Sequence, residues 1–146
     1  MNNSSISHHY GEDHDRLDEL FQRFQTLKSS DRASAVRAFQ EFHAGLERHI
    51  VWEEEILFPA FETKTGMTGG PTQVMRWEHE QIRGFLAAIA GKLAAGADDT
   101  SDDEAGLLAV LGPHNHKEEN ILYPMIDQVT DDAERTQIFA EMEQRA

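Results

Sequence analysis

Two His-x-x-x-Glu motifs recur in the chain 65 residues apart, and each follows a lone histidine by 35 residues. The six residues of this pattern are His14, His49, Glu53, His79, His114 and Glu118. Imidazole nitrogens and carboxylate oxygens are suitable ligands for hard or borderline transition metals. Residues four apart lie on one face of a helix about 5.4 Å from each other, so one ion can contact both members of a motif. The pattern therefore indicates a metal site built on helices.

The second half of the chain repeats the first at an offset of 65 residues. Segment 49–59 is identical to segment 114–124 at six of eleven positions, and the same offset carries His14 onto His79. We therefore expect two helical hairpins, each with a lone histidine on its first helix and a His-x-x-x-Glu motif on its second. Two such hairpins would bring four imidazoles and two carboxylates to the centre of a bundle.

Apolar residues recur at spacings of three and four between clusters of glycine and proline, which predicts amphipathic helices. The first three helices are expected at about 13–28, 31–61 and 71–95, and the fourth carries an apolar stripe from Leu107 to Met125 that includes Ile121. A short fifth helix is expected at about 131–145. The sequence therefore predicts a single all-α domain over 1–146, with an up-down-up-down four-helix bundle at about 10–128.

All six residues of the pattern fall on the apolar stripes of these helices. An unpaired polar group in a core costs several kcal/mol on apolar-transfer scales, so a compensating partner is expected, and a pair of cations is the simplest one. The alternative is that the residues are structural, or were preserved by a gene duplication without a metal. A single buried histidine is usually a hydrogen-bonded core residue. The recurrence of these residues at a single offset favours a metal site over either alternative.

Other polar and aromatic residues are expected to lie outside the site. Surface positions away from the helix seam are predicted for Glu54, Glu55 and Glu119, and a frayed terminus for His8 and His9. The helical phase excludes His43 and His116. Packing within the bundle is predicted for Trp52 and Trp77. Tyr10 stands one turn before His14, so its hydroxyl either reaches the metals or caps the end of the core.

The overall composition excludes several classes of function. The 13 basic and 27 acidic residues give a net charge of −14, which repels nucleic acid and anionic membranes. The absence of cysteine excludes disulfides, thiolate zinc sites, iron–sulfur ligation and thiol catalysis. No apolar run approaches the roughly 20 residues of a membrane span, and segment 1–10 is too polar for a signal peptide. We therefore expect a cytoplasmic protein.

Over about Tyr10 to Asp127, this arrangement of histidines and glutamates resembles the hemerythrin-like HHE cation-binding family. The end of the second helix, Glu-Ile-Leu-Phe-Pro, and that of the fourth, Asn-Ile-Leu-Tyr-Pro, add to the resemblance. It implies two iron ions, one bound by His14 and His49 and the other by His79 and His114. The bridges between the ions would be Glu53, Glu118 and an oxo or hydroxo group.

The sequence also departs from the hemerythrins that carry oxygen. Those proteins bear a second histidine four residues after the first on the third helix, where this chain has Arg83, and an aspartate where it has Glu118. The missing ligand leaves an open or water-filled position on the metals. The chain is in this respect more similar to hemerythrin-like proteins implicated in iron–sulfur repair, nitric oxide handling or the sensing of iron and oxygen.

Two functional hypotheses follow. The first is a di-iron protein that binds or reacts with O2 or NO and receives electrons from a redox partner protein. The second is a metal-responsive or iron-storing interaction protein in which the metals are structural and folding depends on them. An enzyme of broad substrate range is less favoured, because the sequence shows no pocket-defining loop and no separate acid–base pair.

Overall fold

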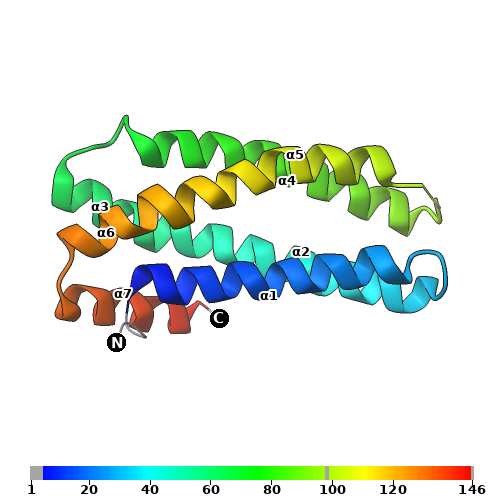
Figure 1. Ribbon diagram of the computed structural model, residues 1–146, viewed down its shortest axis with the longest axis horizontal. Helices are drawn as coiled ribbons and strands as arrows, with labels where there is room; N and C mark the ends of the chain where they lie inside the picture. The colour runs from blue at the N-terminus through cyan, green and yellow to red at the C-terminus, as the bar shows by residue number, and fades with distance from the viewer. Residues whose placement is uncertain (1–4, 98, 146) are drawn as a thin grey trace.

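The computed structural model describes residues 5–97 and 99–145, and every regular element within these ranges is a helix (Figure 1). The elements are α1 (Ile6–Leu27), α2 (Arg32–Trp52), η1 (Glu53–Leu57), α3 (Phe58–Thr65), α4 (Pro71–Ala94), α5 (Ser101–Lys117), η2 (Glu118–Leu122), α6 (Tyr123–Val129) and α7 (Asp132–Gln144), where η marks a π-helical turn. Since α2, η1 and α3 are continuous, as are α5, η2 and α6, the bundle has four long antiparallel rods. The all-α fold of two repeated hairpins is confirmed.

The first helix begins earlier than expected, because two side chains cap its amino end. The Ser5 hydroxyl accepts a hydrogen bond from the backbone of His8. The carboxylate of Asp127, from the other hairpin, accepts hydrogen bonds from the backbone amides of Ile6 and Ser7 at 2.7 and 3.1 Å. These contacts satisfy donors that a helix start otherwise leaves unpaired. His8 and His9 therefore lie within a helix, and the prediction that they occupy a frayed terminus was wrong.

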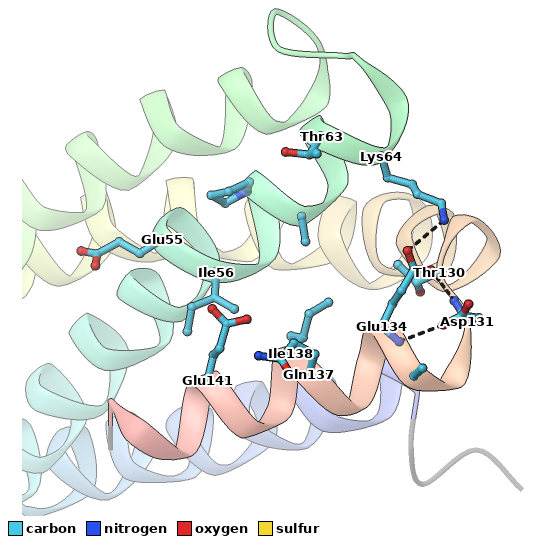
Figure 2. Close-up of a pocket in the computed structure, with 13 residues that line it drawn as sticks. Glu55, Ile56, Thr63, Lys64, Thr130, Asp131, Glu134, Gln137, Ile138 and Glu141 are labelled. Atoms are coloured by element: carbon cyan, nitrogen blue, oxygen red, sulfur yellow. Dashed lines mark hydrogen bonds and ion pairs between the residues drawn. The ribbon is translucent and has the colours of Figure 1, made fainter.

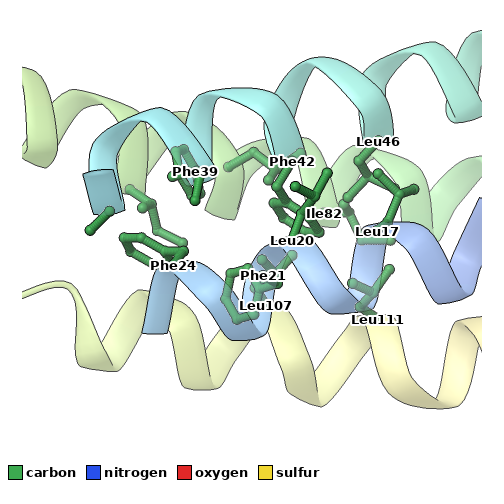
Figure 3. Packing of buried hydrophobic residues seen from close by; sticks show 14 of the residues in the cluster. Leu17, Leu20, Phe21, Phe24, Phe39, Phe42, Leu46, Ile82, Leu107 and Leu111 are labelled. Carbon is green, nitrogen blue, oxygen red and sulfur yellow. The ribbon is translucent and has the colours of Figure 1, made fainter. Parts of the chain in front are cut away.

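The apolar core is divided into two clusters along the bundle. The distal cluster lies toward the loops that join α1 to α2 and α4 to α5, and it includes Leu17, Phe21, Phe24, Phe39, Phe42, Ile82 and Leu107 (Figure 3). The α7-side cluster lies at the opposite end and includes Ile6, Tyr10, Phe58, Met75, Tyr123, Ile138 and Met142. In each rod the histidines and glutamates of the repeat lie between residues of these two clusters. A polar layer therefore crosses the middle of the core.

The C-terminal helix covers the end of the first hairpin. A capping box between Asp131 and Glu134 starts α7, which packs against η1. Ile56 is consequently buried, with 4% of its surface exposed. Its repeat equivalent Ile121 is 54% exposed, so its predicted place on the buried stripe was wrong. The predicted packing of Trp77 within the bundle was also wrong, because this side chain is 62% exposed.

None of the helices within residues 5–97 and 99–145 has the length and apolar character that a membrane-spanning segment requires.

Two glycines in helix interiors give a matched test of how closely the second hairpin is packed. A β-carbon at Gly106 would lie 2.4 Å from Cε1 of Phe85, whereas one at Gly84 would meet nothing within 4 Å. We expect Gly84→Ala to raise the free energy of unfolding by about 0.5–1 kcal/mol through helix propensity. Gly106→Ala should lower the free energy of unfolding by about 1–2 kcal/mol. The clash with Phe85 costs more than the alanine gains in helix propensity. Chemical denaturation of both variants measures the difference, and equal effects would contradict the packing described.

Candidate metal centre

The six residues of the repeated pattern meet in the polar layer. Each is at most 2% exposed, and the lone histidines come from α1 and α4 while the motifs come from the junctions of α2 with η1 and of α5 with η2. Their donor atoms form two overlapping groups, one of His14, His49, Glu53 and Glu118, the other of His79, His114, Glu53 and Glu118. Within each group the atoms lie within 4.8 Å of one another. The structure therefore brings together all six predicted ligands.

The two glutamates lie between the two histidine pairs. Oε2 of Glu53 is 3.4 Å from Nε2 of His49, while its Oε1 is 3.0 Å from Nε2 of His79. Oε1 of Glu118 lies 3.2 Å from Nε2 of His14 and 3.4 Å from Nε2 of His114. Every imidazole thus turns its Nε2 atom toward the centre. Each carboxylate contacts histidines of both pairs, as a bridging ligand would.

The Nδ1 atoms of the four histidines all point outward, and each is bound to a further carboxylate. These outer carboxylates, with their oxygen-to-Nδ1 distances, are Asp13 to His49 at 2.9 Å, Glu54 to His79 at 2.7 Å, Glu78 to His114 at 2.8 Å and Glu119 to His14 at 2.7 Å. A carboxylate on Nδ1 fixes the orientation of the ring and leaves Nε2 free to act as a ligand, an arrangement that is common around protein-bound metals.

The outer carboxylates follow the same repeat as the inner residues. At the 65-residue offset, Glu78 is the equivalent of Asp13 and Glu119 is the equivalent of Glu54. Asp13 and Glu78 each bind a histidine of their own hairpin, whereas Glu54 and Glu119 each bind a histidine of the other hairpin. The prediction that Glu54 and Glu119 lie outside the site was therefore wrong, although Glu119 is on the surface as expected, with 42% of its side chain exposed. The conserved spacing of these acids between the two repeats was a signal that could have identified them.

Tyr123 is a residue of the site that helical periodicity does not predict. Its hydroxyl oxygen lies 2.5 Å from Oε2 of Glu53 and 2.9 Å from Oε1 of Glu118, and its single proton can be donated to only one of them at a time. Tyr123 follows Glu118 by five residues, and in η2 its backbone N–H binds the carbonyl of Glu118. In a regular α-helix a residue five positions on would be turned away, but the π turn brings it back to the same face.

A proline follows both π turns, which gives a local reason for their position. Pro59 and Pro124 each stand one residue after the end-cap of η1 and η2. A proline lacks an N–H and its ring collides with the carbonyl four residues earlier, so the regular α-helical bonding pattern is interrupted there. The Asn-Ile-Leu-Tyr-Pro sequence of the second hairpin is therefore the feature that turns Tyr123 toward the polar layer.

The remaining candidates lie outside the centre. The Tyr10 hydroxyl donates to Sδ of Met142 at 3.3 Å, so this tyrosine belongs to the core rather than to the ligand set. Trp52 is half-buried and its ring lies 6.5 Å from that of Tyr10, in agreement with a packing role. Neither ligand group includes His8, His9, His43, His116 or Glu55.

Strong electrostatic coupling is expected among these buried groups. Burial lowers the pKa of His49, but the charge of Glu53 and the hydrogen bond to Asp13 outweigh this effect and raise the pKa to about 10. Burial likewise opposes charge on His79, yet hydrogen bonds to Glu53 and Glu54 raise its pKa to about 9. Burial and the neighbouring carboxylates raise the pKa of Tyr123 well above its usual value.

The donor set fits a cation, because some of its buried atoms are not satisfied by a regular hydrogen bond. Oε2 of Glu118 makes no hydrogen bond, and Oε1 of Glu53 and Nε2 of His79 face only each other, 3.0 Å apart and outside regular hydrogen-bond geometry. Leaving such groups unsatisfied costs about 1–3 kcal/mol each, and more when they are charged. Nitrogen and oxygen donors at these positions would be satisfied by transition-metal ions.

A surface hollow of about 620 Å³ lies elsewhere, between α7 and the end of the first hairpin (Figure 2). It is lined in part by Ile56 and Ile138 and is crossed by the Lys64–Glu134 ion pair at 2.8 Å. None of the six predicted ligands lines it. The metal centre is therefore an interior layer of the bundle and not an open surface cleft.

Comparison with known protein families shows to which family of helical bundles the chain belongs. The family described as "Hemerythrin HHE cation binding domain" matches residues 5–126, which is most of the chain. The chain belongs to this family. Membership implies that the protein binds a cation, and the two groups of buried histidines and glutamates fit such a site. Comparisons with curated proteins and with solved structures found no match.

The outer carboxylates should strengthen metal binding through the histidines of this HHE domain. Glu78→Ala removes the acceptor 2.8 Å from Nδ1 of His114 and should weaken zinc binding by about 10–100-fold. Glu80→Ala is the matched control, since it removes the same charge from an exposed position two residues away. Competition with a chromophoric chelator measures both affinities. Equal losses in the two variants would show that only the overall charge matters.

The raised histidine pKa values predict how the stability of chelator-treated protein depends on pH. The folded protein holds these protons more tightly than the unfolded chain, whose histidines titrate near 6.5. The stabilisation is complete below that pH and is lost as the pH rises through about 9 and about 10. The melting temperature should therefore fall between pH 7 and 10, and zinc should reduce this fall because a cation then replaces the protons. A melting temperature that does not decline would contradict this electrostatic account.

Proposed function

We propose that this HHE domain binds two iron ions and that the reduced form takes up or reacts with O2 or NO. One ion would be held by His14 and His49, the other by His79 and His114, with both bridged by Glu53 and Glu118. The observation that carries the proposal is the position of the two carboxylates, each within 3.4 Å of Nε2 atoms from both histidine pairs. Two bridging carboxylates between facing helices are typical of di-iron carboxylate bundles.

The ligand chemistry supports a redox metal of this kind. The site offers four imidazole nitrogens and carboxylate oxygens, and a set of this composition suits iron, whereas thiolate chemistry is excluded by the absence of cysteine. Two ferrous ions, when bound, would supply the electrons for the reaction with a diatomic molecule. A redox partner protein would restore the reduced state. The physiological role would then be sensing, repair of iron centres or a response to stress.

The chain itself holds the donors in place and keeps water out. Each ring is fixed through Nδ1 by an outer carboxylate, so Nε2 needs no rearrangement when a metal arrives. Apolar clusters lie on both sides of the polar layer, which favours entry of small uncharged molecules over ions. These properties suit reversible or reactive binding of a gas.

Elemental analysis of protein purified without added metal gives the first test. We expect about two iron ions per chain in the wild type and one or fewer in His49→Ala, which lacks a buried ligand. His43→Ala is the control on the same helix, outside both ligand groups, and should retain the full metal content. Full iron binding by His49→Ala would remove His49 from the ligand set.

Addition of O2 or NO to the anaerobically reduced, iron-loaded protein gives the second test. A change in visible absorption on mixing is expected, and the absence of any change would reject the proposal. Circular dichroism with and without metal distinguishes the competing hypothesis of structural or stored metals. A bundle that loses its helicity when the metal is removed would favour that hypothesis, and one that stays folded favours reactivity.

A further inference from the structure

The two halves of the metal centre are not equivalent, because the repeat is broken at one position. Phe58 and Tyr123 occupy the same place after their π turns, but only the second carries a hydroxyl. The ring of Phe58 stacks on the imidazole of His79, with centroids 5.9 Å apart and planes inclined by 8°. The Tyr123 oxygen lies 3.3 Å from Nε2 of His14 and 3.2 Å from Nε2 of His49. The hydroxyl therefore faces the first histidine pair.

On the side of the other pair, Oε1 of Glu53 and Nε2 of His79 lie 3.0 Å apart and no hydroxyl stands between them. Tyr123 contacts Oε2 of Glu53 and Oε1 of Glu118, and the opposite oxygen of each carboxylate makes no hydrogen bond. Nε2 of His79 also lacks one. The position beside His14 and His49 is thus served by five donors, namely two nitrogens, two carboxylate oxygens and the phenol oxygen. The position beside His79 and His114 has the equivalent set without the phenol.

Arg83 does not supply the missing donor on that side. It occupies the place of the additional histidine of oxygen-carrying hemerythrins, but its guanidinium is drawn outward. Its Nη2 lies 2.6 Å from Oε1 of Glu47 and its Nη1 lies 3.3 Å from Oε1 of Glu54. A guanidinium that remains protonated cannot act as a ligand. The space next to His79 is bounded instead by the apolar ring of Phe58.

We propose that a diatomic ligand binds at the His79–His114 metal position, and that Tyr123 supplies an oxygen donor that fills the corresponding place beside His14 and His49. This inference rests on the proposed di-iron function and specifies which half of the centre is open. The aromatic wall of Phe58 gives a small uncharged ligand an apolar neighbour and offers no hydrogen bond to water.

The repeat provides reciprocal variants that test this assignment. The full-length protein, loaded with iron and reduced, is titrated with NO, and the number of molecules bound per chain is measured by electron paramagnetic resonance and visible absorption. We expect one NO per wild-type chain and two per Tyr123→Phe chain. Phe58→Tyr should weaken binding by about tenfold or more. The double variant, Phe58→Tyr with Tyr123→Phe, should again bind one, because the hydroxyl has moved to the other half.

Cobalt(II) gives a readout that does not depend on gas binding. Loss of an oxygen donor lowers the coordination number of one ion, so Tyr123→Phe should strengthen the visible bands of the cobalt-loaded protein. Phe58→Tyr should weaken them. Circular dichroism checks that the variants, each differing by one oxygen atom, remain folded.

The outcomes separate this inference from the function on which it rests. If the wild type binds no NO and shows no reaction with O2, the proposed function fails, while the cobalt spectra still decide whether Tyr123 is a donor. If the wild type binds NO but Tyr123→Phe changes neither the number bound nor the cobalt spectrum, the proposed function survives and the assignment of the open half is overturned.

Discussion

The burial of four imidazoles and two carboxylates in the middle of a helical bundle is the constraint on which the rest of this structure depends. Charged groups are stable in such a core only when each is next to a group of opposite charge. Outside the imidazoles lie the outer carboxylates, and three of these meet cations in turn. Arg16 lies 3.0 Å from Asp13, Arg83 lies 3.3 Å from Glu54, and Lys117 lies 2.5 Å from Glu78. Metal cations at the centre would give the inner glutamates, Glu53 and Glu118, neighbours of opposite charge.

The same pairs also hold the two hairpins together. Asp13 and Glu78 act within a hairpin, while Glu54 and Glu119 cross from one hairpin to the other. A hairpin alone would have half of the inner ligands and none of the crossing bonds. The site and the interface between the hairpins are therefore one structure, in agreement with the recurrence of inner and outer residues at the same 65-residue offset.

The sequence was sufficient for the fold and for the six inner residues, because both depend on helical periodicity and on the 65-residue repeat. It failed where a side chain meets a partner from another helix. Glu54 and Glu119 are adjacent to the inner glutamates, and one residue in a helix is a turn of about 100°, which suggested a surface position. Their partners, His79 and His14, lie on the opposite hairpin, and no periodicity within one helix reveals such a contact.

The π turns account for a second group of errors. After Glu118 the wider turn shifts the helical phase, so Leu122 and Tyr123 become buried while Ile121 is 54% exposed. In the first hairpin the same shift is less apparent because α7 covers Ile56. Steps of three and four therefore predict Ile121 in the core and give no indication of Tyr123. The residue that distinguishes the two halves of the centre was hidden by a local change of helix type. A backbone feature is thereby linked to the proposed reactivity. The proline-associated π turn decides which side chain faces the polar layer, and in the arrangement that we propose a single oxygen atom on that side chain would decide which half of a nearly symmetric site stays open.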